Sequence, residues 1–245
     1  MVGSRIAIIP ARGGSKRIPE KNIIDFFGKP MIAWTIEAAK DSGLFARILV
    51  STDDQKIADV AEKWGAEVPF LRQEFADDHT PVSEASASAL QQAMDYWEEE
   101  YSSVTQLMAN CPMRKSEDIK AALTQFEVHG RDFQISCFKY GWMNPWWAVQ
   151  LDESHHPRRI FPDAAAKRSQ DLPELYCPTG AIWVANAKAL LSARTFYGPE
   201  HVFEPISWDR AVDIDDYDDL SFAAALYTKM SESHEDKVHA SRIPR

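Results

Sequence analysis

Long hydrophobic runs and an excess of basic charge are both missing from this 245-residue chain. No apolar run approaches the roughly 18 residues of a membrane-spanning helix, and the N-terminus has no apolar signal segment, so we expect neither a membrane protein nor an exported one. The formal net charge is −10, whereas general binding to nucleic acid or to anionic membranes requires a basic face. These absences argue against nucleic-acid and membrane partners.

Cysteine is also scarce. Cys111, Cys137 and Cys177 are widely spaced and form no CxxC pair. An odd number without that spacing is typical of buried thiols in a reducing compartment and does not favour a zinc site, so we expect a cytoplasmic location. Hydrophobic residues make up 45% of the chain, which is enough to build the core of one large domain.

Strand-like and helix-like segments alternate along most of the chain. The strand-like segments are 6–9, 47–51, 67–71, 103–108, 133–138 and 180–184. The helix-like segments are 30–42, 55–64, 83–101, 116–128 and a last one through Leu190 and Leu191. This order predicts an α/β domain with a mainly parallel sheet and helices on both faces. We assign residues 1–230 to this single domain and 231–245 to a polar C-terminal tail, which we expect to be frayed.

Residues 139–178 interrupt the alternation. They contain Trp142, Trp146 and Trp147, several prolines and little periodicity. We interpret them as an insertion whose exposed aromatic side chains suit a subunit interface. A local core beneath a long loop is the alternative.

A basic, glycine-containing loop follows the first predicted strand. Residues 10–22, PARGGSKRIPEKN, carry four cationic side chains in an otherwise acidic chain. Glycine lets backbone N–H groups approach a phosphate closely, and the cations neutralise its charge. Ligands of parallel sheets bind at the carboxyl ends of the strands, where 52–54 and 110–114 are also expected. The loop therefore predicts a phosphate site, with a basic surface turn as the alternative.

Two carboxylates, Asp213 and Asp215, form the second signal. In an extended segment, side chains two residues apart point the same way. Two like charges held that close are costly unless a cation lies between them. A magnesium ion held partly by protein and partly by substrate phosphates would meet this need. The alternative is an acidic helix start, which suffices for Asp218 and Asp219.

Several blocks of the chain, in order, resemble the acylneuraminate cytidylyltransferases, which make CMP-activated nonulosonic acids. The blocks are 8–22, 28–32, 50–54, 168–173, 180–182 and the pair Asp213 and Asp215, and together the resemblance covers residues 5–227. It implies a Rossmann-like nucleotide-diphospho-sugar transferase fold, and a homodimer in which the 139–178 insertion reaches across to the neighbouring subunit.

The resemblance also implies an activity. A hydroxyl of a nonulosonic acid attacks the α-phosphate of CTP and releases pyrophosphate, with Mg²⁺ on the phosphates and the product destined for flagellin or surface glycans. The implied phosphate site comprises the side chains of Arg12, Lys16 and Lys21, backbone N–H groups of Gly13, Gly14 and Ser15, and Asn22. Arg72 would contact the base or ribose, Arg168 and Gln170 the sugar, and Asp213 and Asp215 the metal, with Asp215 counted among the catalytic residues.

Three positions depart from the family pattern. Met108 stands where the family has glutamine, Arg17 where the sialic acid enzymes often have glycine, and Thr179 where they often have asparagine. The missing glutamine and asparagine predict a sugar other than N-acetylneuraminate. Residues 109–112 and 168–173 favour the pseudaminic acid branch, whereas 180–182 favour the sialic or legionaminic branches. A degenerate, non-catalytic nucleotide-binding relative that acts as a partner scaffold is the alternative.

Overall fold

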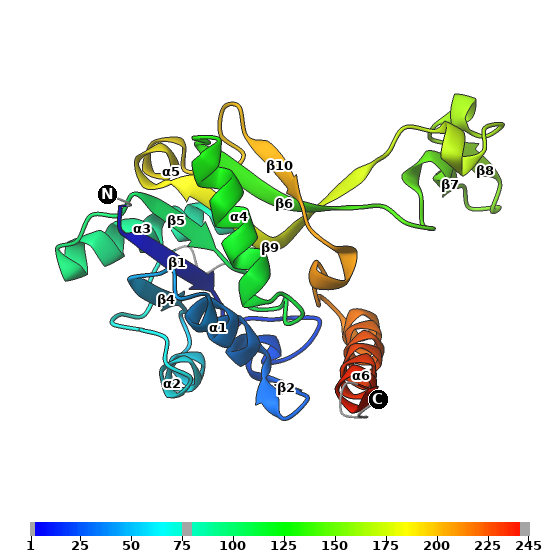
Figure 1. The fold of residues 1–245 in the computed structure, drawn as a ribbon. Coiled ribbons are helices and arrows are strands. Elements are labelled where there is room, and N and C mark those ends of the chain that lie inside the picture. Colours follow the sequence, from blue (N-terminus) through cyan, green and yellow to red (C-terminus); the bar gives the residue numbers. More distant parts are fainter. Residues whose placement is uncertain (1–2, 75–79, 241–245) are drawn as a thin grey trace.

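A six-stranded sheet forms the centre of the computed structural model, which describes residues 3–74 and 80–240, with side chains through residue 231 (Figure 1). The strand order is β10-β6-β9-β5-β1-β4. The bounds are β1 (Arg5–Pro10), β4 (Arg47–Ser51), β5 (Ser103–Gln106), β6 (Phe133–Lys139), β9 (Tyr176–Asn186) and β10 (Val202–Pro205). All of them run in one direction except β9, which is antiparallel to both neighbours. The prediction of a mainly parallel sheet is confirmed.

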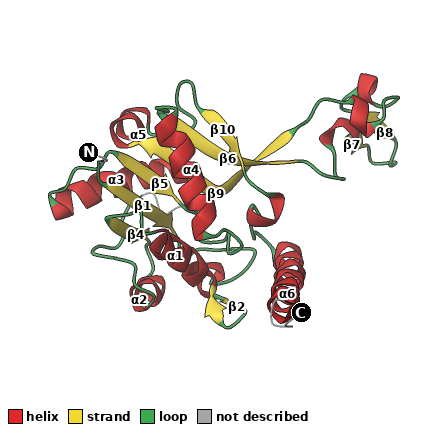
Figure 2. Ribbon diagram, viewed as in Figure 1, coloured by secondary structure: helices red, strands yellow, loops and turns green. Residues whose placement is uncertain are grey.

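Helices cover both faces of this sheet, as predicted (Figure 2). One face carries α1 (Met31–Ser42), α2 (Gln55–Lys63) and α4 (Ser116–Val128), and the other carries α3 (Val82–Trp97) and α5 (Ala187–Ala193). Strand β1 alternates between the two cores: Ala7 and Ile9 belong to one, Ile6 and Ile8 to the other. No helix in the described part of the chain is both long and apolar enough to cross a bilayer.

Two sequence predictions differ from the structure. Residues 67–71 form no strand: Glu67 makes a single parallel bridge to Leu49, and Pro69 cannot donate a further ladder hydrogen bond because it lacks an N–H. The tail expected to be frayed beyond Ser231 is helical over its described part, because α6 (Tyr217–Ala240) continues through it. Residues 241–245 lie outside the described part.

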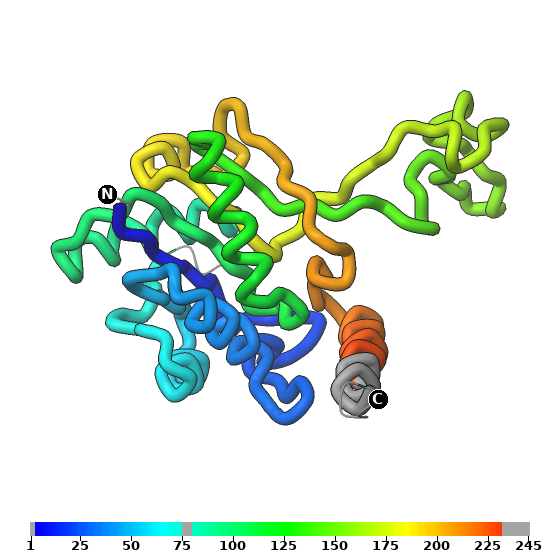
Figure 3. Tube along the Cα trace, viewed as in Figure 1, coloured from blue at the N-terminus to red at the C-terminus, as the bar shows by residue number. Residues whose placement is uncertain are grey.

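The 139–178 insertion is an arm. Strands β6 and β9 extend beyond the sheet and lead into a small unit that contains β7 (Val149–Leu151) and β8 (Pro157–Arg159), clearly separated from the main body (Figure 3). The unit has a modest core in which Trp146 packs against Phe161 with ring centroids 4.9 Å apart. Trp142, in contrast, is 86% exposed. The arm therefore has a local core and also a free apolar surface.

A third core joins the two segments that carry the predicted chemistry. Ile18, within the basic loop, and Ile214, between the two aspartates, are both fully buried in this cluster. Phe26 of strand β2 (Asp25–Phe26), which pairs with β3 (Lys29–Pro30), belongs to it, as does Ala223 of α6. Packing of these apolar side chains thus holds a cationic loop and an acidic segment together.

We expect substitutions of Ile214 to destabilise the protein in proportion to the volume removed. Ile214→Val should lower the free energy of unfolding by about 0.5–1.5 kcal/mol and Ile214→Ala by about 2–5 kcal/mol, because the side chain is fully buried. Chemical denaturation measures both values. Val128→Ala is the control, because Val128 is 74% exposed. A loss for Ile214→Ala no larger than that of the control would contradict the packing described above.

Candidate active site

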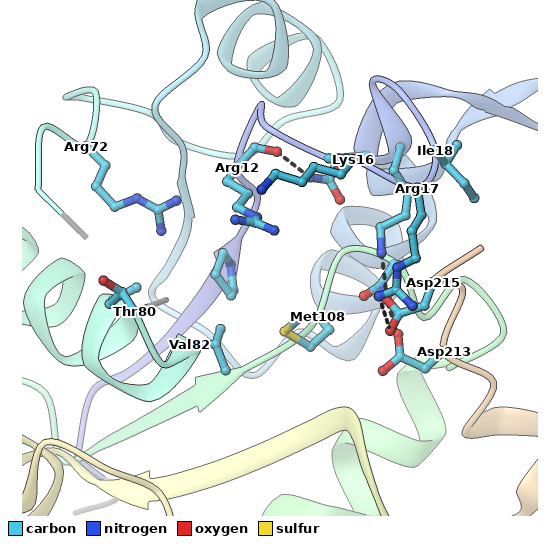
Figure 4. Close-up of a pocket in the computed structure, with 16 residues that line it drawn as sticks. Arg12, Lys16, Arg17, Ile18, Arg72, Thr80, Val82, Met108, Asp213 and Asp215 are labelled. Atoms are coloured by element: carbon cyan, nitrogen blue, oxygen red, sulfur yellow. Dashed lines mark hydrogen bonds and ion pairs between the residues drawn. The ribbon is translucent and has the colours of Figure 1, made fainter. Parts of the chain in front are cut away.

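A cleft of about 580 Å³ lies at the carboxyl edge of β1, β4 and β5 (Figure 4). It is lined by the basic loop, the segment before and at the start of α3, the loop after β5 and the 213–215 segment. Among the described residues, five cationic side chains and two carboxylates line it: Arg12, Lys16, Arg17, Lys21, Arg72, Asp213 and Asp215. The cleft is therefore a net positive site in a chain of net charge −10, which suits a small polyanion.

Internal hydrogen bonds shape the basic loop. The Gly13 N–H donates to Asp53 Oδ1 at 3.0 Å, the Ser15 N–H donates to the Gly13 carbonyl at 2.9 Å, and the Asn22 amide donates to the Arg12 carbonyl at 2.9 Å. A Cβ at Gly13 would lie 2.6 Å from Asp54 Oδ2, so this glycine is needed for close packing. Two of the three N–H groups predicted to face a phosphate are thus already engaged, that of Gly13 by Asp53 and that of Ser15 within the loop.

The acidic segment is tied to the loop by cations. Lys21 Nζ lies 2.8 Å from both the Ile214 carbonyl and Asp215 Oδ1, and Arg17 lies 2.9 Å from Asp215 Oδ2 (Figure 4). Asn110 donates to Asp213 Oδ1. The segment belongs to no strand, so these contacts hold it in place of a sheet.

Burial and neighbouring charges shift the pKa values of the two carboxylates in opposite directions. Burial, followed by the neighbouring charge of Asp215, raises the pKa of Asp213 from 3.8 to about 6. Burial acts on Asp215 as well, but the hydrogen bond and charge of Lys21, together with Arg17, outweigh it and lower the pKa of that carboxyl. Cations therefore outweigh burial at Asp215 but not at Asp213.

The carboxylate pair suits a divalent cation. Such an ion would relieve the repulsion that raises the Asp213 pKa, and the Asn110 Oδ1 atom nearby is buried without a hydrogen-bond partner. The described residues provide no cluster of three or more histidine, cysteine or acidic side chains, so substrate and water would have to complete the ligand set.

Arg72 lies at the other end of the cleft (Figure 4). Its side chain is buried, which lowers its pKa, and its Nε atom has no hydrogen-bond partner within residues 3–74 and 80–231. Asp53, 3.9 Å away, is the carboxylate that also accepts the Gly13 N–H. Asp53 thus connects Arg72 to the basic loop.

The predicted sugar residues lie elsewhere. Arg168 and Gln170 are on the arm, where Arg168 pairs with Asp171 at 2.7 Å, and neither lines the cleft of its own chain. Met108 does line the cleft, whereas Gln106 is buried and accepts a hydrogen bond from Ser86 at 2.7 Å. Gln106 therefore does not replace, within the cleft, the glutamine that was expected at position 108.

Sequence reasoning assigned no role to several lining residues. The missed residues are Thr80, Val82 and Ala85. Arg17 was predicted only as one of the four cations of the loop, and Asn110 only as part of the 110–114 segment at this edge of the sheet. The contacts of Arg17 depend on tertiary structure and have no signal in the local sequence.

Known proteins share the sequence of this chain to a substantial extent. Residues 6–230 match the family model described as cytidylyltransferase. The chain belongs to the cytidylyltransferase family. A pseudaminic acid cytidylyltransferase of Campylobacter jejuni is 36% identical over 234 residues, covering 93% of this chain and 98% of that protein. A CMP-N,N'-diacetyllegionaminic acid synthase of Legionella pneumophila is 36% identical over 221 residues, covering 86% and 90%.

The solved structures extend the comparison to the fold. A CMP:2-keto-3-deoxy-manno-octonic acid synthetase complexed with CTP has a TM-score of 0.69 and 16% identity, covering 93% of this chain and 99% of that one. This likeness confirms the predicted nucleotidyltransferase fold, and the relatives confirm the predicted family. Cytidylyltransferases of this kind generally use a divalent metal.

We expect the raised pKa of Asp213 to make stability pH-dependent in metal-free buffer. The native state binds the Asp213 proton more tightly than the unfolded state, so the contribution of Asp213 to the free energy of unfolding should fall as pH rises from about 4 to 6. Asp213→Asn removes this cost. The variant should match the wild type near pH 4 and exceed it by about 1–3 kcal/mol at pH 7.5.

Denaturation in EDTA across that range measures the difference, with Asp218→Asn, at an exposed position, as the control. A gain for Asp213→Asn that does not change with pH would show that the Asp213 carboxyl titrates normally.

Proposed function

We propose that this cytidylyltransferase couples CTP to a nonulosonic acid, giving the CMP-sugar and pyrophosphate. The observation that carries the proposal is the union of a cationic loop and a carboxylate pair in one cleft, joined through Lys21. The family match and relatives named for pseudaminic and legionaminic acid support it. Among acceptors we place pseudaminic acid first, then legionaminic and N-acetylneuraminic acids.

The nucleotide would lie along the cleft with its triphosphate over the basic loop. Arg12 and Lys16 line the cleft and would neutralise the phosphates. Gly14 does not line the cleft, so its backbone N–H would contact a phosphate only at the rim of the loop. Lys21, near the end of the loop, contacts Asp215, and its ammonium group would meet the α-phosphate there. Fixed cations of this kind stabilise the charge that develops during phosphoryl transfer.

Asn22 and Arg72 would make the remaining nucleotide contacts. Asn22 lines the cleft but uses its amide to hold the Arg12 carbonyl, so it would shape the loop as much as bind ligand. Buried Arg72, with its unpartnered Nε, would bind the base or ribose. Both remain predictions.

We propose Mg²⁺ as the divalent ion. Asp213 and Asp215 would hold it, with the triphosphate supplying further oxygens. When bound, it would neutralise phosphate charge and help to orient the leaving pyrophosphate. The residues of this chain supply the rest: Lys21 orients Asp215, and the loop fixes the triphosphate.

We further propose a homodimer in the cytoplasm. Arg168 and Gln170 lie on the arm, outside their own cleft, so they would reach the sugar only in a neighbouring subunit. The exposed apolar side chains of the arm support an interface there. The three free cysteines, two of them buried, agree with a reducing compartment. The product would serve flagellin or surface glycan modification.

Asp215→Asn should abolish turnover while the protein stays folded. We expect pyrophosphate release, measured with CTP, Mg²⁺ and each of the three sugars, to fall by at least about 100-fold, because the change removes a metal ligand and the partner of Lys21. Asp218→Asn should keep wild-type turnover. Normal turnover in Asp215→Asn would eliminate the metal assignment, and a wild type inactive with every sugar despite binding CTP would favour a non-catalytic scaffold.

Trp142→Glu should weaken the dimer. Trp142 is 86% exposed on the arm, and burying a glutamate there in an apolar interface is costly. Light scattering during size-exclusion chromatography should show a dimer for the wild type and monomer for the variant at low micromolar concentration. Tyr96→Glu, on α3 at a position 58% exposed, should remain dimeric. A monomeric wild type would refute the arm interface.

A further inference from the structure

Asn110 makes an unusual set of contacts with the acidic segment. Its backbone carbonyl accepts the Ile214 N–H at 3.0 Å, and its side-chain amide donates to the Ile214 carbonyl at 2.9 Å. A single residue in the loop after β5 therefore hydrogen-bonds both the N–H and the carbonyl of Ile214. Because the segment belongs to no strand, these bonds satisfy the backbone polar groups of Ile214 as a neighbouring strand would in a sheet.

The same amide also reaches both carboxylates. Asn110 Nδ2 donates to Asp213 Oδ1 and lies 3.3 Å from Asp215 Oδ1. The residue is only 4% exposed, and its Oδ1 atom is buried with no partner among the described residues. An amide nitrogen has two hydrogens, and here three oxygens surround it. Because most buried acceptors in folded proteins are hydrogen-bonded, the unpaired Oδ1 points to a role beyond packing.

We propose that Asn110 is a positioning residue that sets the spacing and direction of Asp213 and Asp215 at the divalent-cation site. The inference rests on the cation site of the proposed function. By donating to Asp213 and lying 3.3 Å from Asp215 Oδ1, the neutral amide stands between two like charges without itself adding charge. Partners that orient metal ligands in this way commonly change metal affinity 10–100-fold when removed.

The comparison of two substitutions tests this role. Asn110→Ala removes the donor, so we expect Mn²⁺ to bind about tenfold more weakly, measured without nucleotide from the EPR signal of free Mn²⁺. Asn110→Asp replaces the donor by a third carboxylate of the same shape. It should lower the thermal unfolding midpoint in EDTA, and Mn²⁺ should then raise that midpoint by more than it does in the wild type.

Asn186→Asp provides a matched control. Asn186 caps α5 by accepting the N–H groups of Lys188 and Ala189 at 3.0 and 3.2 Å, and a carboxylate can accept the same bonds. This variant makes the same chemical change outside the cleft, so its Mn²⁺ affinity and its Mn²⁺-dependent midpoint shift should equal those of the wild type.

Two outcomes would overturn the role of Asn110. One is wild-type Mn²⁺ affinity in Asn110→Ala, and the other is a midpoint loss in Asn110→Asp that is equal with and without Mn²⁺. If the wild-type chain itself binds no Mn²⁺ in the millimolar range, the two carboxylates hold no cation without nucleotide, and the role of Asn110 at such a site fails with them. Pyrophosphate release by the wild type, measured separately, decides whether the enzymatic proposal survives that result.

Discussion

The active site depends on one long-range contact, the attachment of the Ile214 segment to the basic loop. The Ile214 side chain is buried in the same core as Ile18, and its carbonyl accepts a hydrogen bond from Lys21 at 2.8 Å. Apolar packing is not directional, whereas the lysine bond fixes where the carboxylates point. Together they place a strongly cationic loop against two acids in an otherwise acidic protein.

In this arrangement, cationic and acidic side chains occupy different parts of the cleft. The cations of the loop line one side, and the carboxylate pair lies at one end, where Lys21 and Arg17 compensate Asp215 and leave Asp213 with a raised pKa. A triphosphate and a divalent ion complete such a site, because each supplies the charge that the other needs. Arg17 adds a further cation at this end of the cleft.

Sequence patterns predicted the elements that local physics determines. Segment 47–51 and segment 116–128 coincide with β4 and α4, since buried apolar runs and a charged helix start are local signals. The strand predicted at 67–71 does not form, because its apolar residues lie in a loop and Pro69 interrupts the pairing. The placement of Arg168 outside the cleft and the bonds of Asn110 depend on how distant segments meet, which spacing along the chain does not encode.

Isotopic labelling of CTP tests the central claim most directly, namely that the cleft transfers the α-phosphorus to a nonulosonic acid. With CTP labelled at the α-phosphorus, the wild-type enzyme and pseudaminic acid, we expect the label in a nucleotide–sugar product. With the label at the γ-phosphorus, it should appear in pyrophosphate. Transfer of the γ-label to the sugar, or its release only as inorganic phosphate, would contradict nucleotidyl transfer.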